Sequence, residues 1–230
     1  MNKLQFKELI QKNFKNIPND FFDLIEKYKN FVQTKNKLFN LTNFANDEVI
    51  YQKYFFDSII DYKPIDFLKI NNVLDIGSGS GIPGIIIKLL FRHINLTIIE
   101  ATNKKVKFLN ELVNYLNLQN ITIINKRAEK INDNEYESFD LVTSRAVAKL
   151  RVLLEISTPY AKISGLIVEP KSKKYNQELI DAKNIMEELD LSLINEYDFN
   201  SNKVLHHTFV FKKNKKTNHK YPRNWKQIIS

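Results

Sequence analysis

The chain has 230 residues, a formal net charge of +9 and no cysteine. The missing thiol excludes a disulfide framework, a thiolate metal site and a cysteine nucleophile. The length suits one α/β domain with an accessory element. No stretch approaches the roughly 18 uninterrupted apolar residues of a membrane span, and residues 1–15 lack the apolar run of a signal peptide. We therefore expect a soluble cytoplasmic protein that makes no membrane contact.

Residues 1–70 are predicted to form an N-terminal helical extension. After a start signal at residues 18–20, apolar side chains recur at helical spacing. These side chains are Phe21, Leu24, Ile25, Tyr28, Phe31 and Val32. Residues 40–43 (Asn-Leu-Thr-Asn) predict a loop, residues 47–60 a further helix, and Pro64 a break.

After the extension, short β-branched runs alternate with helical patterns, and this alternation predicts an α/β core over residues 71–211. Such a core has a parallel sheet with helices on both faces. The runs are Val73–Ile76, Leu96–Glu100, Ile121–Ile124, Phe139–Thr143 and Leu166–Glu169. Thr102 or Asn103 is the expected cap of the helix after the second run. Residues 191–197 and 204–211 are predicted closing strands, for which an antiparallel direction is open.

The first predicted strand runs into a glycine loop, Gly77–Gly84, and then into a helical pattern. Glycine permits positive φ and close backbone approach, so a ligand can lie against Gly77, Gly79 and Gly81. Glu100 ends the second strand, where a carboxylate can accept both hydroxyls of a ribose. The loop also spells G-x-G-x-x-G, so its spacing alone does not separate an S-adenosylmethionine site from an NAD site. The long helical segment before the first strand favours the former.

The end of the chain, residues 212–230, is predicted to be a basic tail. From residue 199 onward the chain carries eight basic residues and no acidic one. They are Lys203, Lys212, Lys213, Lys215, Lys216, Lys220, Arg223 and Lys226. This pattern is typical both of a solvated terminus and of a phosphate-binding segment. Tyr221 and Trp225 either pack inside or stack on exposed bases.

Several motifs, in the expected order and over nearly the whole chain, resemble the bacterial RsmG family, also called GidB. The motifs are Asn40-Leu41-Thr42 with Asp57-Ser58, Asp75–Gly84, Lys104–Leu109, Arg127-Ala128-Glu129, Ser144–Ala148 and Lys220–Arg223. The resemblance implies a Rossmann-like class I S-adenosylmethionine-dependent methyltransferase with a mostly parallel sheet and helices on both faces. It also implies the reaction, methylation of N7 of a guanine in 16S ribosomal RNA.

The resemblance implies a set of site residues. The expected cofactor-binding residues are Gly77, Gly79, Gly81, Ile82, Glu100, Ala128, Glu129 and Arg145. Arg145 and Lys171 are the expected catalytic residues, and the relative roles of these two and of Arg223 are open. Guanine N7 already presents a lone pair, so no general base is needed. A recognition Arg or Lys should donate to guanine O6 and leave N7 free.

The sequence departs from the family pattern at several positions. Tyr54 stands where the family usually has His, and Ser172 replaces a glycine after Lys171. Glu100 replaces the commoner Asp and keeps the ribose-binding chemistry. Residues 224–226 (Asn-Trp-Lys) differ from the family's glycine- and proline-containing ending.

The expected partner is 16S ribosomal RNA or the small ribosomal subunit. The four histidines form no metal-binding pattern, so we expect no metal. The oligomeric state is open, with a monomer favoured. Two other functions stay open at this point: a methyltransferase for another RNA or a small molecule, and a non-catalytic RNA-binding assembly factor.

Overall fold

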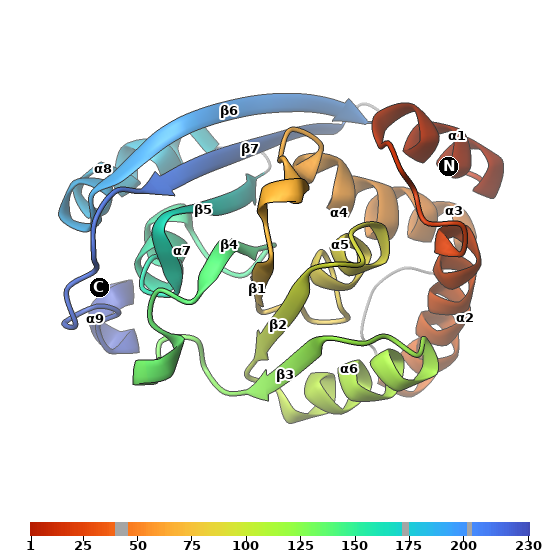
Figure 1. The fold of residues 1–230 in the computed structure, drawn as a ribbon, viewed down its shortest axis with the longest axis horizontal. Coiled ribbons are helices and arrows are strands. Elements are labelled where there is room, and N and C mark those ends of the chain that lie inside the picture. Colours follow the sequence, from red (N-terminus) through yellow and green to blue (C-terminus); the bar gives the residue numbers. More distant parts are fainter. Residues whose placement is uncertain (40–45, 172–174, 202–203) are drawn as a thin grey trace.

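The computed structural model describes residues 1–39, 46–171, 175–201 and 204–230 (Figure 1). The predicted loop at 40–43, the motif Asn40-Leu41-Thr42, and the residues Ser172 and Lys203 lie outside these ranges. Within them the chain forms one seven-stranded sheet in the order β3-β2-β1-β4-β5-β7-β6. Both predicted layers of helices are present, so the α/β prediction is confirmed.

The strands follow the predicted pattern, with a few longer ends. They are β1 Asn72–Ile76, β2 Asn95–Glu100, β3 Ile121–Asn125, β4 Phe139–Ser144, β5 Ala161–Lys171, β6 Leu191–Ser201 and β7 Val204–Lys213. The first five pair in parallel, whereas β7 is antiparallel to β5 and β6. β7 also continues past residue 211, the predicted end of the core, because Lys212 and Lys213 still pair with β5 and β6.

One face of the sheet is covered by the N-terminal helices together with α5 and α6. These elements are α1 Lys3–Asn13, α2 Phe21–Phe39, α3 Asp47–Val49, the π-helical η1 Ile50–Phe56, α4 Asp57–Ile59, α5 Gly84–Leu90 and α6 Asn103–Tyr115. The helix predicted over 47–60 is therefore present, but its middle is π-helical and a 3₁₀ turn at Ile60–Tyr62 ends it before Pro64. Their buried side chains share one hydrophobic cluster with Val73 of β1.

The other face is covered by α7 Leu150–Ser157, α8 Tyr175–Leu189 and the short C-terminal α9 Trp225–Ile229 (Figure 1). Their apolar side chains form a second cluster, which contains Leu74. Val73 and Leu74 thus point to opposite faces, as successive residues of a strand must. Short 3₁₀ turns at Phe67–Lys69 and Asp133–Glu135 complete the described elements.

The sheet order determines where a ligand can bind. β1 pairs with β2 on one side and with β4 on the other, so the chain reverses its direction of travel across the sheet at this point. In open α/β sheets a crevice forms at this switch, beyond the carboxyl ends of the strands. In the described ranges no helix is long and apolar enough to span a membrane.

Candidate active site

The glycine loop after β1 needs glycine for two separate reasons. Gly77, Gly79 and Gly81 have φ of 71°, 63° and 101°, which L-residues with a side chain rarely adopt. A Cβ on Gly81 would also lie 2.6 Å from the Tyr28 hydroxyl oxygen, and one on Gly77 would lie 2.7 Å from a Val147 methyl carbon. The loop therefore brings its backbone unusually close to neighbouring elements.

Asp75, two residues before the loop, supports the loop through hydrogen bonds. Its carboxylate is fully buried, and Oδ2 accepts hydrogen bonds from the Ser78 hydroxyl at 2.5 Å and the Gly84 amide at 2.8 Å. Burial raises the pKa of Asp75 to about 6, although both hydrogen bonds oppose that rise. The sequence places Asp75 inside a motif but gives it no role, whereas the structure shows that it ties the two ends of the loop together.

The N-terminal extension holds the loop from the side. The hydroxyls of Tyr28 in α2 and Tyr54 in η1 both donate to the Ser80 carbonyl, at 2.6 and 3.0 Å. Both tyrosines are completely buried, and burial raises the pKa of each well above its usual range. Tyr54, which stands in place of the family histidine, therefore supports the loop as a neutral hydroxyl.

A pocket of about 300 Å³ opens at the carboxyl ends of β1, β2 and β3. Its lining includes Gly77, Glu100, Ala128, Glu129, Val147 and Trp225. Four of these are predicted cofactor-binding residues, so the structure brings them together. Gly79, Gly81 and Ile82 do not line this pocket. The Gly79 amide donates to Glu100, the Gly81 amide donates to the Ser78 carbonyl, and Ile82 packs on the first hydrophobic cluster.

Glu100 is held rigidly at the pocket wall. Its side chain is buried, Oε2 accepts the Gly79 amide at 3.1 Å, and Oε1 accepts the Thr102 amide at 2.9 Å. A carboxylate oxygen has two lone pairs, so each oxygen keeps acceptor capacity beyond its amide. The Glu129 carboxylate, in contrast, is ion-paired with Arg127.

Arg145 follows β4 directly and is not itself among the lining residues of the pocket. The next two residues, Ala146 and Val147, do line it, so Arg145 lies at the rim of the pocket. Its guanidinium donates to the Lys53 carbonyl at 3.3 and 3.4 Å, so η1 holds it through long hydrogen bonds to one acceptor. Lys171 is placed differently: its ammonium donates to the Ala148 carbonyl at 3.1 Å and lies 3.0 Å from a Glu178 carboxylate oxygen.

Three buried acids lie near this rim, and none of them has a role that the sequence predicts. Asp57 lies 3.5 Å from the His206 ring, and this contact raises the pKa of that histidine. Burial raises the pKa of Asp61 to about 6, while the positive charge of Arg145 opposes the rise. Burial likewise raises the pKa of Glu169 to about 8, and its Oε2 accepts the Ser144 hydroxyl at 2.8 Å. No cluster of His, Asp or Glu suited to a metal ion occurs in the described part of the chain.

Comparison with known proteins identifies the family. Residues 22–203 match the sequence profile of the family described as GidB, rRNA small subunit methyltransferase G. The chain belongs to this family. The resemblance inferred from the motifs is therefore confirmed, and with it the enzyme class, an S-adenosylmethionine-dependent methyltransferase of ribosomal RNA.

Curated relatives in the family cover the whole chain. It is similar to ribosomal RNA small subunit methyltransferase G of Ureaplasma parvum serovar 3, with 40% identity over 100% of this chain and 98% of the relative. It is also similar to the protein of the same name from Malacoplasma penetrans, with 44% identity over 100% of this chain and 98% of the relative.

Solved structures of lower identity support the fold. TYW2 of M. jannaschii in complex with AdoMet has a TM-score of 0.54 and 20% identity, over 68% of this chain and 76% of that chain. A putative O-methyltransferase from Klebsiella pneumoniae has a TM-score of 0.56 and 12% identity, over 92% of this chain and 97% of that chain. The Rossmann-like methyltransferase fold implied by the family resemblance is thereby confirmed.

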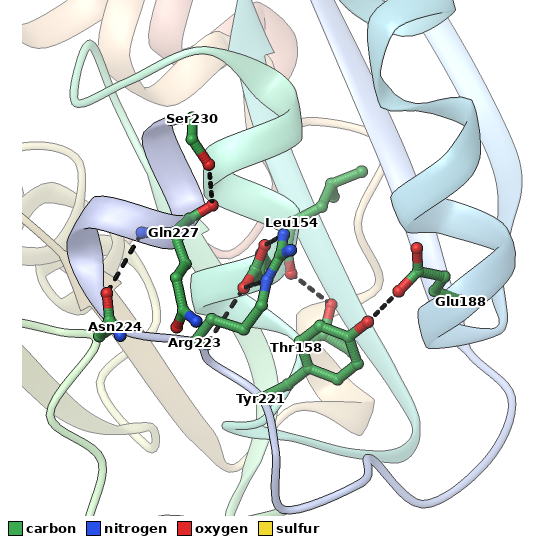
Figure 2. Close-up of polar contacts among 9 residues, drawn as sticks. Leu154, Thr158, Glu188, Tyr221, Arg223, Asn224, Gln227 and Ser230 are labelled. Atoms are coloured by element: carbon green, nitrogen blue, oxygen red, sulfur yellow. Dashed lines mark hydrogen bonds and ion pairs between the residues drawn. The ribbon is translucent and has the colours of Figure 1, made fainter.

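The C-terminal segment, where the sequence departs from the family ending, is folded onto the core (Figure 2). Three of its basic residues are ion-paired: Lys213 with Glu137, Lys215 with Asp190 and Arg223 with Glu155. Tyr221 is buried and its hydroxyl bonds to Glu188, so base stacking by Tyr221 is excluded in this arrangement. Trp225 is half-buried and lines the pocket.

Proposed function

We propose that this chain transfers the methyl group of S-adenosylmethionine to N7 of a guanine in 16S ribosomal RNA. One observation carries the proposal: in a member of this family, Gly77, Glu100 and Ala128 line one pocket, and Arg145 directly precedes two further lining residues at its rim. The pocket supplies a place for the cofactor, and the rim supplies a cation for the acceptor base.

The residues of the pocket fit the cofactor. Glu100 is fixed by two backbone amides and retains acceptor capacity for ribose hydroxyls. Gly77, whose φ is positive, leaves backbone instead of side chain against the ligand, and Ala128 adds a small apolar surface. S-adenosylmethionine, when bound, supplies an electrophilic methyl group.

Guanine N7 carries its own lone pair, so the methyl transfer needs no general base. The protein has to orient the guanine and to stabilise the charge that moves during the transfer. Arg145 is proposed to donate to guanine O6, which leaves N7 free to face the pocket. Lys171 is proposed to position Arg145, because its ammonium joins the Ala148 carbonyl on the Arg145 loop to Glu178 of α8.

The test is to map N7-methylguanine by mass spectrometry in 16S RNA from cells with and without the protein, and to assay purified enzyme on small subunits and on naked 16S RNA. We expect one guanine to lose its methyl group on deletion. Arg145→Ala should lower kcat/KM for RNA about 100-fold, the equivalent of roughly 2.7 kcal/mol. Arg92→Ala is the matched control, since Arg92 lies just before β2, at the amino ends of the parallel strands and away from the pocket at their carboxyl ends. An unchanged methylation pattern on deletion would contradict the proposal.

A further inference from the structure

Trp225, the single tryptophan of the chain, is the first residue of α9 and lines the cofactor pocket. It reaches the pocket from the C-terminal segment, whereas Gly77 and Glu100 reach it from the central strands. Trp225 packs against the hydrophobic cluster that contains α7, and Ile156 of α7 lines the pocket beside it. The ring therefore forms part of the pocket wall and is not a loose surface group.

The segment before α9 fixes this position (Figure 2). The Glu155 carboxylate on α7 is completely buried, and it accepts hydrogen bonds from Arg223 Nε at 2.8 Å, from a second guanidinium nitrogen at 2.6 Å and from the Arg223 amide at 3.1 Å. The Asn224 side chain caps α9 by accepting from the Gln227 amide at 3.2 Å. Trp225 follows immediately, so these charge-assisted contacts determine where its ring lies.

The pocket wall next to Trp225 combines apolar side chains with one cation. The Arg127 guanidinium lies 4.7 Å from the centre of the Trp225 ring, and Ala128 lines the pocket beside it. The Ala128 carbonyl accepts a hydrogen bond from the Tyr160 hydroxyl at 2.7 Å, so this backbone group already has a hydrogen-bond partner. An aromatic ring, a methyl group and the Ile156 side chain together suit a planar heteroaromatic ring.

We propose that Trp225 contacts the adenine ring of the cofactor and closes the C-terminal side of its pocket. This inference rests on the proposed function, because adenine is the planar aromatic part of S-adenosylmethionine. A nucleobase of the RNA is the other planar ligand. The geometry favours the cofactor, since Arg145 is held by η1 on one face of the sheet while Trp225 packs with α7 on the other.

The single tryptophan gives a direct readout that needs no turnover. S-adenosylhomocysteine is titrated into the full-length protein while the emission of Trp225 is recorded, and its Kd is measured independently by calorimetry. We expect a saturable change in emission with the calorimetric Kd. Trp225→Ala should raise that Kd about tenfold, whereas Trp225→Phe should stay within about threefold of wild type. The KM for RNA should not change in either variant.

Ile229→Ala is the matched control, because Ile229 lies on the same short helix and is exposed. It should leave both the emission change and the Kd as in wild type. Thermal unfolding of each variant shows whether it is folded, and Trp225→Phe keeps the test available if Trp225→Ala is not.

The outcomes separate the two proposals. If wild-type protein fails to bind S-adenosylhomocysteine in the calorimeter, the proposed function fails first. If it binds while the emission stays constant and Trp225→Ala binds equally well, the adenine contact is wrong. A raised KM for RNA with an unchanged Kd for S-adenosylhomocysteine would also overturn it and would assign Trp225 to the RNA.

Discussion

Two segments outside the central strands support the cofactor site, and different chemistry holds each of them: the N-terminal segment contacts the glycine loop, and the C-terminal segment lines the pocket. On the N-terminal side, the neutral hydroxyls of Tyr28 and Tyr54 meet the Ser80 carbonyl. On the C-terminal side, Arg223 pairs with Glu155, a carboxylate that is completely buried. A neutral hydrogen bond contributes about 1 kcal/mol net, while removing one partner of a buried ion pair costs about 3–5 kcal/mol. Substitutions on the two sides should therefore lower the free energy of unfolding by very different amounts.

The ion pair should give the largest effect. Arg223→Ala leaves the Glu155 carboxylate buried without its partner, and we expect a loss of about 2–4 kcal/mol in the free energy of unfolding. The value is set at the lower end because the Arg223 side chain is 37% exposed and water can reach the vacated space. Urea unfolding measures the loss, with exposed Lys226→Ala as control. Adding Glu155→Leu to Arg223→Ala should recover part of the stability, and a double variant as unstable as the single one would argue against a charge-based cost.

The same contrast explains what the sequence can predict. The glycine loop, Glu100 and the strands are evident because their signals are local: turn residues, a carboxylate at a strand end and β-branched runs. The partners of the C-terminal basic residues are not, because the acids that pair with them lie far away in the chain, in α7 and before β4. A stretch without acids therefore resembles a free tail although Lys213 and Arg223 are ion-paired in the fold.

The hydroxyl contacts around the glycine loop could not be predicted from the sequence pattern either. Tyr28 belongs to an apolar helical stripe, and nothing in its spacing indicates a bond to Ser80, which is 52 residues away. The position of Arg145 after the fourth strand follows from the sequence, but a functional role for it is favoured only through the family resemblance, since a lone arginine after a strand is commonly a surface residue. Long-range packing decides these positions.

The glycine loop itself should give the next largest effect. Gly81→Ala combines an unfavourable φ with a Cβ 2.6 Å from the Tyr28 hydroxyl oxygen, and we expect a loss of about 2–3 kcal/mol. Gly79→Ala is the matched control, because its φ is also positive but its Cβ would meet no atom closer than 4.0 Å. It should lose only about 1 kcal/mol. Chemical unfolding and calorimetry with S-adenosylhomocysteine measure both variants, and equal losses would show that the hydroxyl contact adds nothing.

Glu169 represents a third kind of support, a buried acid whose Oε2 accepts the Ser144 hydroxyl and whose charge is only partly opposed by Lys171. Burial raises its pKa from the usual 4.5 to about 8, although Lys171 and Ser144 counteract the rise. The folded state therefore keeps a proton that the unfolded state releases, and stability falls as pH rises from about 4.5 to about 8. Glu169→Gln mimics the neutral acid, so its advantage over wild type should grow to about 2 kcal/mol by pH 9.

Thermal unfolding between pH 5 and pH 9 tests this, with Glu187→Gln on the exposed side of α8 as control. The Glu187 variant should follow the wild-type profile. A constant offset between Glu169→Gln and wild type across the whole pH range would show that Glu169 does not titrate there.

The smallest effect is expected from Tyr54→Phe, which tests the neutral hydrogen bonds of the N-terminal segment. The substitution removes one of the two hydroxyls that meet the Ser80 carbonyl but leaves the buried ring, so Tyr28 still satisfies that carbonyl at 2.6 Å. We expect a loss of about 1 kcal/mol and a rise of at most about threefold in the Kd for S-adenosylhomocysteine. Tyr54→His restores the family residue at a site that is completely buried. A more stable histidine variant would show that this site accepts an imidazole, whereas a loss larger than that of Tyr54→Phe would show that the packing here has become specific for tyrosine.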